Sequence, residues 1–174
     1  TNGEIVKGYA IHNLYQNDDN PKQSQLVTDY PVDFFWGVHE LKAGVTIPSW
    51  TLQQALLTQI GNGAAEKLHN PKYSLIANPF NNKYQNCTEH TLNIINAAIY
   101  NTTDMAQLKA NTMAHFKPHK VSTSRFKLAL GNMFVDGIRL SDHQGKVATT
   151  TFGSITQYLA NNDLLEHTAV LTPD

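Results

Sequence analysis

The sequence predicts a single α+β domain, and two stretches with different periodicities lead to this prediction. Asn86 is a favourable helix N-cap, and the apolar residues of 92–99 recur behind it at helical spacing. From Glu4 to Tyr15, apolar residues instead alternate between two faces, as in a central strand. With 174 residues, of which 41% are hydrophobic and 16% charged, the chain is long enough for one domain over 1–174.

Shorter patterns predict the remaining elements. Loops rich in Asn and Pro are expected at 17–21 and 78–82. Tyr30 to Trp36 is dense in aromatic residues, which predicts a short helical turn or a packed loop in the core. The other predicted elements are a strand over 43–47, a helix from Ser49 to about Ile60, a short helix over 64–68, a short strand over 73–77, a helix capped by Thr103 or Asp104, a helix over 124–134, a helix over 151–159 and a closing strand over 167–171.

Cys87 is the candidate nucleophile. It is the only cysteine, so it forms no intramolecular disulfide, and it falls in the first turn of the predicted helix. Free backbone N–H groups and the helix dipole at that position favour a thiolate and can stabilise an oxyanion. Glu89 completes a capping-box-like pattern with Asn86, and it lies with Asn93 and Asn96 on the face opposite the apolar stripe. The alternative interpretation of Cys87 is a small buried hydrophobic residue.

A cysteine nucleophile needs a base, and the chain has eight histidines. His12 is the best-placed candidate, because it lies on a predicted strand that a helix can cover. The alternative is a core histidine with a satisfied hydrogen bond. His90 shares the helix of Cys87, which rarely lets an imidazole approach the sulfur in line. His115 and His119 have a metal-like spacing, but Pro118 interrupts their helix, so no metal site is predicted.

Composition excludes several other classes. The formal net charge is -1 and basic residues are scattered, which predicts no general attraction to nucleic acid. No long uninterrupted apolar run predicts a transmembrane helix, and Thr1 to Glu4 does not resemble a signal peptide. No cofactor is expected. The polarity comes from Asn, Gln and Thr more than from charge, which agrees weakly with a secreted or periplasmic surface.

The segment from Asn86 to His90, followed by an apolar helix, resembles the nucleophile helix of circularly permuted papain-like enzymes. These are the NlpC-type and lecithin-retinol-acyltransferase-like enzymes. Tyr9 to Leu14 resembles the strand that carries their orienting polar residue. The resemblance implies a papain-like, permuted NlpC-type domain with a helix on an antiparallel sheet. It also implies that Cys87 is the nucleophile and that His12 is the orienting residue or the base.

The chain is also similar to an uncharacterised family of secreted bacterial proteins with a domain of unknown function. Four segments between about residues 5 and 100 carry this similarity: 29–35, 45–49, 68–79 and 83–89. The family's base histidine lies on the strand before the one that holds His12. Since this chain begins inside the turn between those strands, we expect that first strand to be missing before residue 1. The resemblance implies a periplasmic or secreted location.

Together these observations predict a cysteine acyl hydrolase or transferase that acts on an unidentified amide or ester. In it, Asn86 and Glu89 form the capping and oxyanion region around Cys87. The substrate is a peptide, a cell-wall amide or a lipid ester, and the sequence does not select one. Two alternatives remain: a non-catalytic binding or structural module on the same scaffold, and a chain that is one product of processing. No oligomeric state is predicted.

Overall fold

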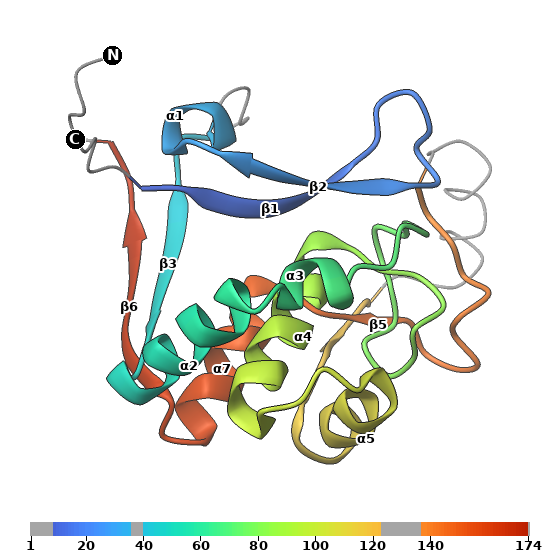
Figure 1. Ribbon diagram of the computed structural model, residues 1–174. Helices are drawn as coiled ribbons and strands as arrows, with labels where there is room; N and C mark the ends of the chain where they lie inside the picture. The colour runs from blue at the N-terminus through green and yellow to red at the C-terminus, as the bar shows by residue number, and fades with distance from the viewer. Residues whose placement is uncertain (1–8, 36–39, 123–136, 174) are drawn as a thin grey trace.

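The structure, a computed structural model, describes residues 9–35, 40–122 and 137–173. Its described strands form three two-stranded antiparallel sheets, and helices pack between and beside them (Figure 1). The predicted α+β class is therefore confirmed. The predicted helix over 124–134 lies outside the described residues.

The first sheet pairs β1 (Ile11–Gln16) with β2 (Ser24–Asp29), with Leu14 opposite Leu26. The predicted loop between them is confirmed, and the Asn17 side chain accepts hydrogen bonds from the backbone at its start. No strand was predicted at β2, where polar residues interrupt the alternation. Within the described part of the chain, β1 pairs with β2 alone, so the central position predicted for this strand is not observed.

The second sheet pairs β3 (Ala43–Pro48) with β6 (Leu165–Leu171), which confirms the predicted strands at 43–47 and 167–171. Helix α2 (Trp50–Gly61) follows β3, and α7 (Phe152–Asn161) precedes β6. Thr151 and Ser154 form a capping box at the start of α7. Both helices agree with the predicted ones, because apolar periods are local signals; a side-chain cap is formed by Thr151 at α7, whereas the Ser49 side chain makes no cap bond at α2.

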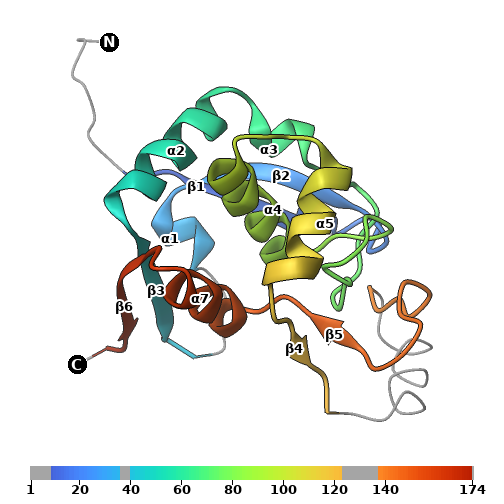
Figure 2. The ribbon, with the colours of Figure 1, turned by 90° about the horizontal axis from the view of Figure 1, so that it is seen from below.

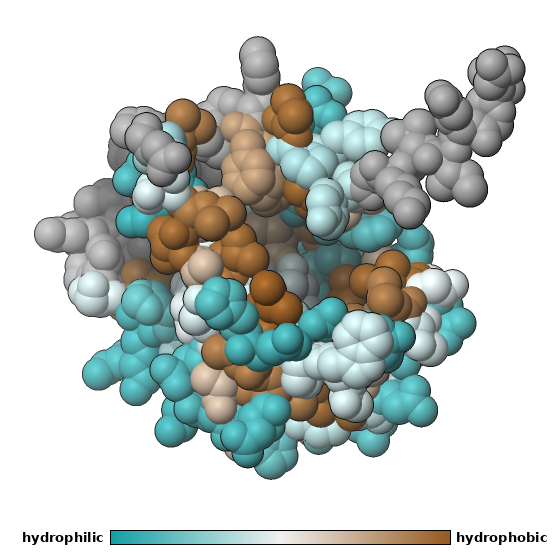
Figure 3. Space-filling view, turned by 90° about the vertical axis from the view of Figure 1, so that its left-hand side faces the viewer, coloured by the Kyte–Doolittle hydropathy of each residue, from teal (hydrophilic) through white to brown (hydrophobic). Residues whose placement is uncertain are grey.

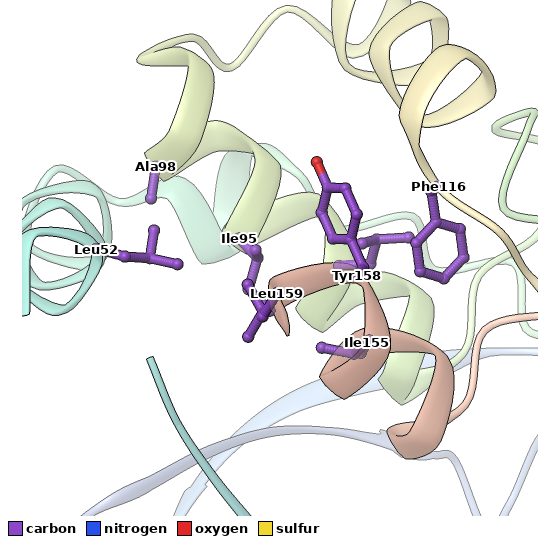
Figure 4. Close-up of a cluster of buried hydrophobic side chains, with 8 residues drawn as sticks. Leu52, Ile95, Ala98, Phe116, Ile155, Tyr158 and Leu159 are labelled. Atoms are coloured by element: carbon purple, nitrogen blue, oxygen red, sulfur yellow. The ribbon is translucent and has the colours of Figure 1, made fainter. Parts of the chain in front are cut away.

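The main core lies where α4 (Cys87–Tyr100) packs against α2 and α7. Side chains of all three helices point toward one another there (Figure 4). The eight buried members of this cluster are Leu52, Leu92, Ile95, Ala98, Phe116, Ile155, Tyr158 and Leu159. The predicted apolar stripe of the cysteine helix is thus confirmed at Leu92 and Ile95, and burial of this stripe holds the start of α4 in place.

Two further helices border α4. Helix α3 (Ala64–Lys67) and helix α5 (Met105–His115) lie beside α4 (Figure 2). Ala64 of α3, Leu68 directly after it and Leu108 of α5 pack with Ala97 in a second cluster. Helix α5 ends before Pro118, as predicted, and His119 lies in β4 (His119–Lys120), which pairs with β5 (Ala148–Thr149).

Two local predictions are wrong: the core position of the aromatic stretch and the strand over 73–77. The aromatic stretch does form a helical turn, the short helix α1 (Pro31–Phe34), but Tyr30 is 69% and Val32 75% exposed, so its described part is not core. Residues 73–77 form no strand beyond an isolated bridge between Tyr73 and Gln85. They belong instead to a long loop that passes the start of β2 and leads to Cys87, with Ser24 N donating to the Pro71 carbonyl.

None of the helices in the described ranges has both the length and the apolar character needed to cross a bilayer.

Candidate functional site

Cys87 is the first residue of α4, and Asn86 fixes the chain at this point. The Asn86 side chain accepts a hydrogen bond from Glu89 N at 2.9 Å and donates one to the Leu75 carbonyl at 2.8 Å. Asn86 is 3% exposed, so both bonds are shielded from water. The predicted N-cap is confirmed, and it also anchors the helix start to the preceding loop.

The Cys87 side chain is exposed, but protein atoms crowd its sulfur on one side. This partial desolvation raises the pKa of the thiol, and the backbone N–H groups of Thr88 and Cys87 only partly offset it by favouring the thiolate. The resting sulfur is therefore a protonated thiol at neutral pH. Tyr73 lies nearby: its burial, with a smaller contribution from a charged Cys87, raises its pKa to about 12.

The Glu89 side chain does not return to the helix start as the capping-box pattern predicts. It forms a buried ion pair with Lys109 of α5. Lys109 also donates to the Pro79 carbonyl and to Asn93 Oδ1, both at 3.1 Å, and Asn93 donates to Glu89 at 2.9 Å. Desolvation raises the pKa of the Glu89 carboxyl, and the Lys109 ammonium acts in the opposite direction.

This network lies on the polar face of the cysteine helix that the sequence predicts. Glu89, Asn93 and Asn96 form that face, and all three are 0% exposed. Asn96 donates to Thr112 at 2.9 Å and accepts from the Tyr158 hydroxyl at 3.0 Å. Helices α5 and α7 supply the hydrogen-bond and ion-pair partners that offset the cost of burying these polar groups. No periodicity in the sequence reveals such partners.

His12 lies on β1 and is exposed, so the alternative of a core histidine is wrong. Its Nδ1 lies 3.2 Å from the hydroxyl of Thr28, the residue opposite it on β2. No hydrogen bond joins an imidazole to the Cys87 sulfur within residues 9–35, 40–122 and 137–173. The roles of His12 and Cys87 therefore stay predictions.

A cavity of about 550 Å³ lies between the β1–β2 sheet and the helices α2, α4 and α7. Figure 3 shows a hollow bordered by apolar side chains on this side of the molecule. His12 lies in the wall from β1, and Thr88 and Thr91 lie in the wall from the first turns of α4. The structure thus places the predicted histidine strand and the start of the cysteine helix on opposite walls of one cavity.

The face of α4 that borders this cavity is also the face of Cys87. Its lining residues are Thr88, His90, Thr91, Ile94 and Ile95. Each helical residue advances by about 100°, so Cys87 lies within about 60° of His90, Thr91 and Ile94 around the helix axis. Cys87 is not itself among the lining residues, but it lies at the N-terminal end of the helix face that they form.

His90 is a feature that the sequence analysis undervalued. It is 4% exposed, and its burial lowers the pKa of the ring to about 4, with a further contribution from His69. The two rings lie 6.2 Å apart, edge to face. His90 is consequently neutral at physiological pH. The available signal was its position one helical turn before Ile94, on the same side of the helix.

No group of three or more His, Cys, Asp or Glu side chains within the described ranges is arranged to hold a metal ion.

A model of the family described as "Uncharacterized protein conserved in bacteria (DUF2145)" matches residues 1–159. The chain belongs to this DUF2145 family. Neither a curated protein nor a solved structure matches it. The predicted membership of an uncharacterised bacterial family is confirmed, and the DUF2145 match extends past residue 100, where the resembling motifs ended. The relationship to papain-like enzymes stays a prediction.

Proposed function

We propose that this DUF2145 chain is a cysteine acyl hydrolase or acyltransferase with Cys87 as its nucleophile. One observation carries the proposal: the exposed residue Cys87 begins the 14-residue helix α4, directly before Thr88, which lines a cavity of about 550 Å³. A helix start supplies the backbone N–H donors that an oxyanion requires, and the cavity supplies room for a substrate.

The reaction has two steps. The Cys87 sulfur bonds to the substrate carbonyl carbon and gives its proton to a base. The bond from that carbon to the leaving oxygen or nitrogen then breaks, and the leaving group takes the proton. Water, or an acceptor hydroxyl or amine, next attacks the thioester carbon. This second attack releases the acyl product and returns the proton to the sulfur.

A base is necessary because the resting thiol is not ionised at neutral pH. His12 is the candidate in the described chain, as the base itself or as the residue that orients an imidazole on a preceding strand. Its Nδ1 is held by Thr28, which leaves Nε2 for that contact. Asn86 positions Cys87, and Glu89 fixes the opposite face of α4 through Lys109.

We further propose the permuted papain-like architecture for this site. A capped helix that begins with cysteine and contacts an antiparallel strand carrying a histidine agrees with it. A secreted or periplasmic location belongs to the same proposal and rests on resemblance and on the polar, weakly charged composition.

Acylation of the protein by p-nitrophenyl butyrate tests the proposal. Because Cys87 is the only thiol, intact mass should show one butyryl group that neutral hydroxylamine removes, as expected for a thioester. Cys87→Ser, the matched control, should give no hydroxylamine-sensitive adduct. His12→Gln should slow acylation by about 10²- to 10⁴-fold if His12 is the base. An unmodified wild-type protein that also releases no p-nitrophenol, or an equal adduct on Cys87→Ser, would disprove the nucleophile.

A non-catalytic binding module is the second candidate, and the exposed apolar residues around α1 favour it. Phe34 and Phe35 are 37% and 40% exposed and join Tyr30 and Val32 on the surface. Such a module predicts that Phe34→Ser abolishes a partner interaction while Cys87→Ala leaves it intact. The reverse result favours the enzyme.

A further inference from the structure

The walls of the cavity beside Cys87 are mainly aliphatic. They are formed by side chains of both strands of the first sheet, of β3, and of α2, α3, α4 and α7. Examples are Leu14, Leu26, Leu56, Ile60, Ile94 and Ile155. A volume of about 550 Å³ falls within the range of small-molecule sites. Apolar walls of this size favour a ligand with a hydrocarbon body.

Several polar residues in the lining already use their hydrogen-bonding groups within the protein. Thr28 pairs with His12 at 3.2 Å, and Thr46 pairs with the Thr156 hydroxyl at 2.8 Å. Thr91 donates to the Cys87 carbonyl at 3.0 Å. His12 Nε2 and the buried His90 Nδ1 stay available, but a peptide or sugar has more polar groups than these two can satisfy, at about 1–3 kcal/mol for each group left unpaired. The walls therefore disfavour two of the three substrate classes considered for Cys87.

The charges of the lining residues further restrict the chemical class of the ligand. The described lining includes no lysine or arginine, and its one acidic residue, Glu66, is exposed. His90, also in the lining, stays neutral because burial lowers its pKa to about 4. A carboxylate would find a like charge and no cation there. An uncharged ester or amide avoids this repulsion.

We propose that this cavity holds the hydrocarbon chain of a neutral fatty acyl ester or amide, whose carbonyl lies at the start of α4 beside Cys87. The acyl group is then transferred to the sulfur. This inference deepens the proposed function and rests on it for the transfer step. Binding of the chain depends on the cavity alone, so the two can fail separately.

Fluorescence titration with cis-parinaric acid methyl ester tests binding in Cys87→Ala, where no acylation can occur. We expect saturable one-to-one binding, and weaker binding of the free acid. Ala65→Phe and Ile60→Trp add bulk from two different walls and should each weaken binding at least about 10-fold. Ala106→Phe, at an exposed site on α5, is the matched control and should bind like Cys87→Ala. Thermal unfolding checks that each variant is folded.

A series of p-nitrophenyl esters from acetate to dodecanoate tests the same cavity without any cavity variant. Each buried methylene should raise kcat/KM by about fourfold until the cavity is filled. Ester binding without acylation would refute the proposed function and keep the cavity assignment. Acylation without ester binding and without chain-length dependence would overturn the lipid inference alone. Absence of both ester binding and acylation would overturn both the lipid inference and the proposed function.

Discussion

Replacement of Lys109 by methionine is the most direct test of what holds the cysteine helix in place. The substitution keeps most of the side-chain volume and removes the cation from beside Glu89, which is fully buried. It also removes donors to Asn93 and to the Pro79 carbonyl. Loss of one partner of a buried pair leaves an uncompensated charge, so we expect a cost of about 3–5 kcal/mol at pH 7.5.

The cost should depend on pH. Desolvation already raises the pKa of Glu89, and without Lys109 it rises further. A carboxyl whose pKa is higher in the folded than in the unfolded state binds more protons when folded, so stability increases as pH falls. The deficit of Lys109→Met should therefore shrink between pH 7.5 and 5.5, by at most about 1.4 kcal/mol per pH unit for one proton.

Equilibrium unfolding in urea at pH 7.5, 6.5 and 5.5 measures this deficit. Lys72→Met, on the exposed loop, is the matched control and should change stability by no more than about 0.5 kcal/mol. Glu89→Gln combined with Lys109→Met should recover part of the loss, because no charge then remains buried. A deficit equal to that of Lys72→Met, or one that does not vary with pH, would refute the ion-pair argument.

Three other predictions concern the start of α4 and its neighbours. Asn86→Ala should destabilise the protein by about 1–2 kcal/mol in urea unfolding, because it removes the side-chain cap bond. Ser49→Ala should have little effect, because Ser49 makes no such bond. Equal losses of stability in the two variants would contradict the role of the cap. The rate at which iodoacetamide alkylates the ligand-free Cys87 thiol should rise with pH, with a midpoint above the ordinary pKa of about 8.5, since desolvation raises the pKa of this thiol. A midpoint below that value would show that the backbone N–H groups outweigh desolvation. The ring signals of His90 in NMR should stay constant from pH 8 to about 5.5 and shift only near its pKa of about 4; a transition near 6.5 would show that the ring is solvated.

The sequence by itself determined the elements whose signals are local. Asn86 before the stripe of Leu92 and Ile95 determined α4, and Thr151 determined the start of α7. It also placed Cys87 at a helix start, because capping and helical periodicity depend on neighbours within four residues. The α+β class and membership of an uncharacterised bacterial family could likewise be predicted.

Tertiary structure alone decided which face of α4 carries buried polar residues and which face borders a cavity. The sequence predicts a capping-box role for Glu89, whereas its actual counter-charge, Lys109, comes from another helix. The exposure of His12 and of Tyr30 likewise depends on which elements cover them. Burial is set by contacts between segments distant in the chain, which a pattern of neighbouring residues does not encode.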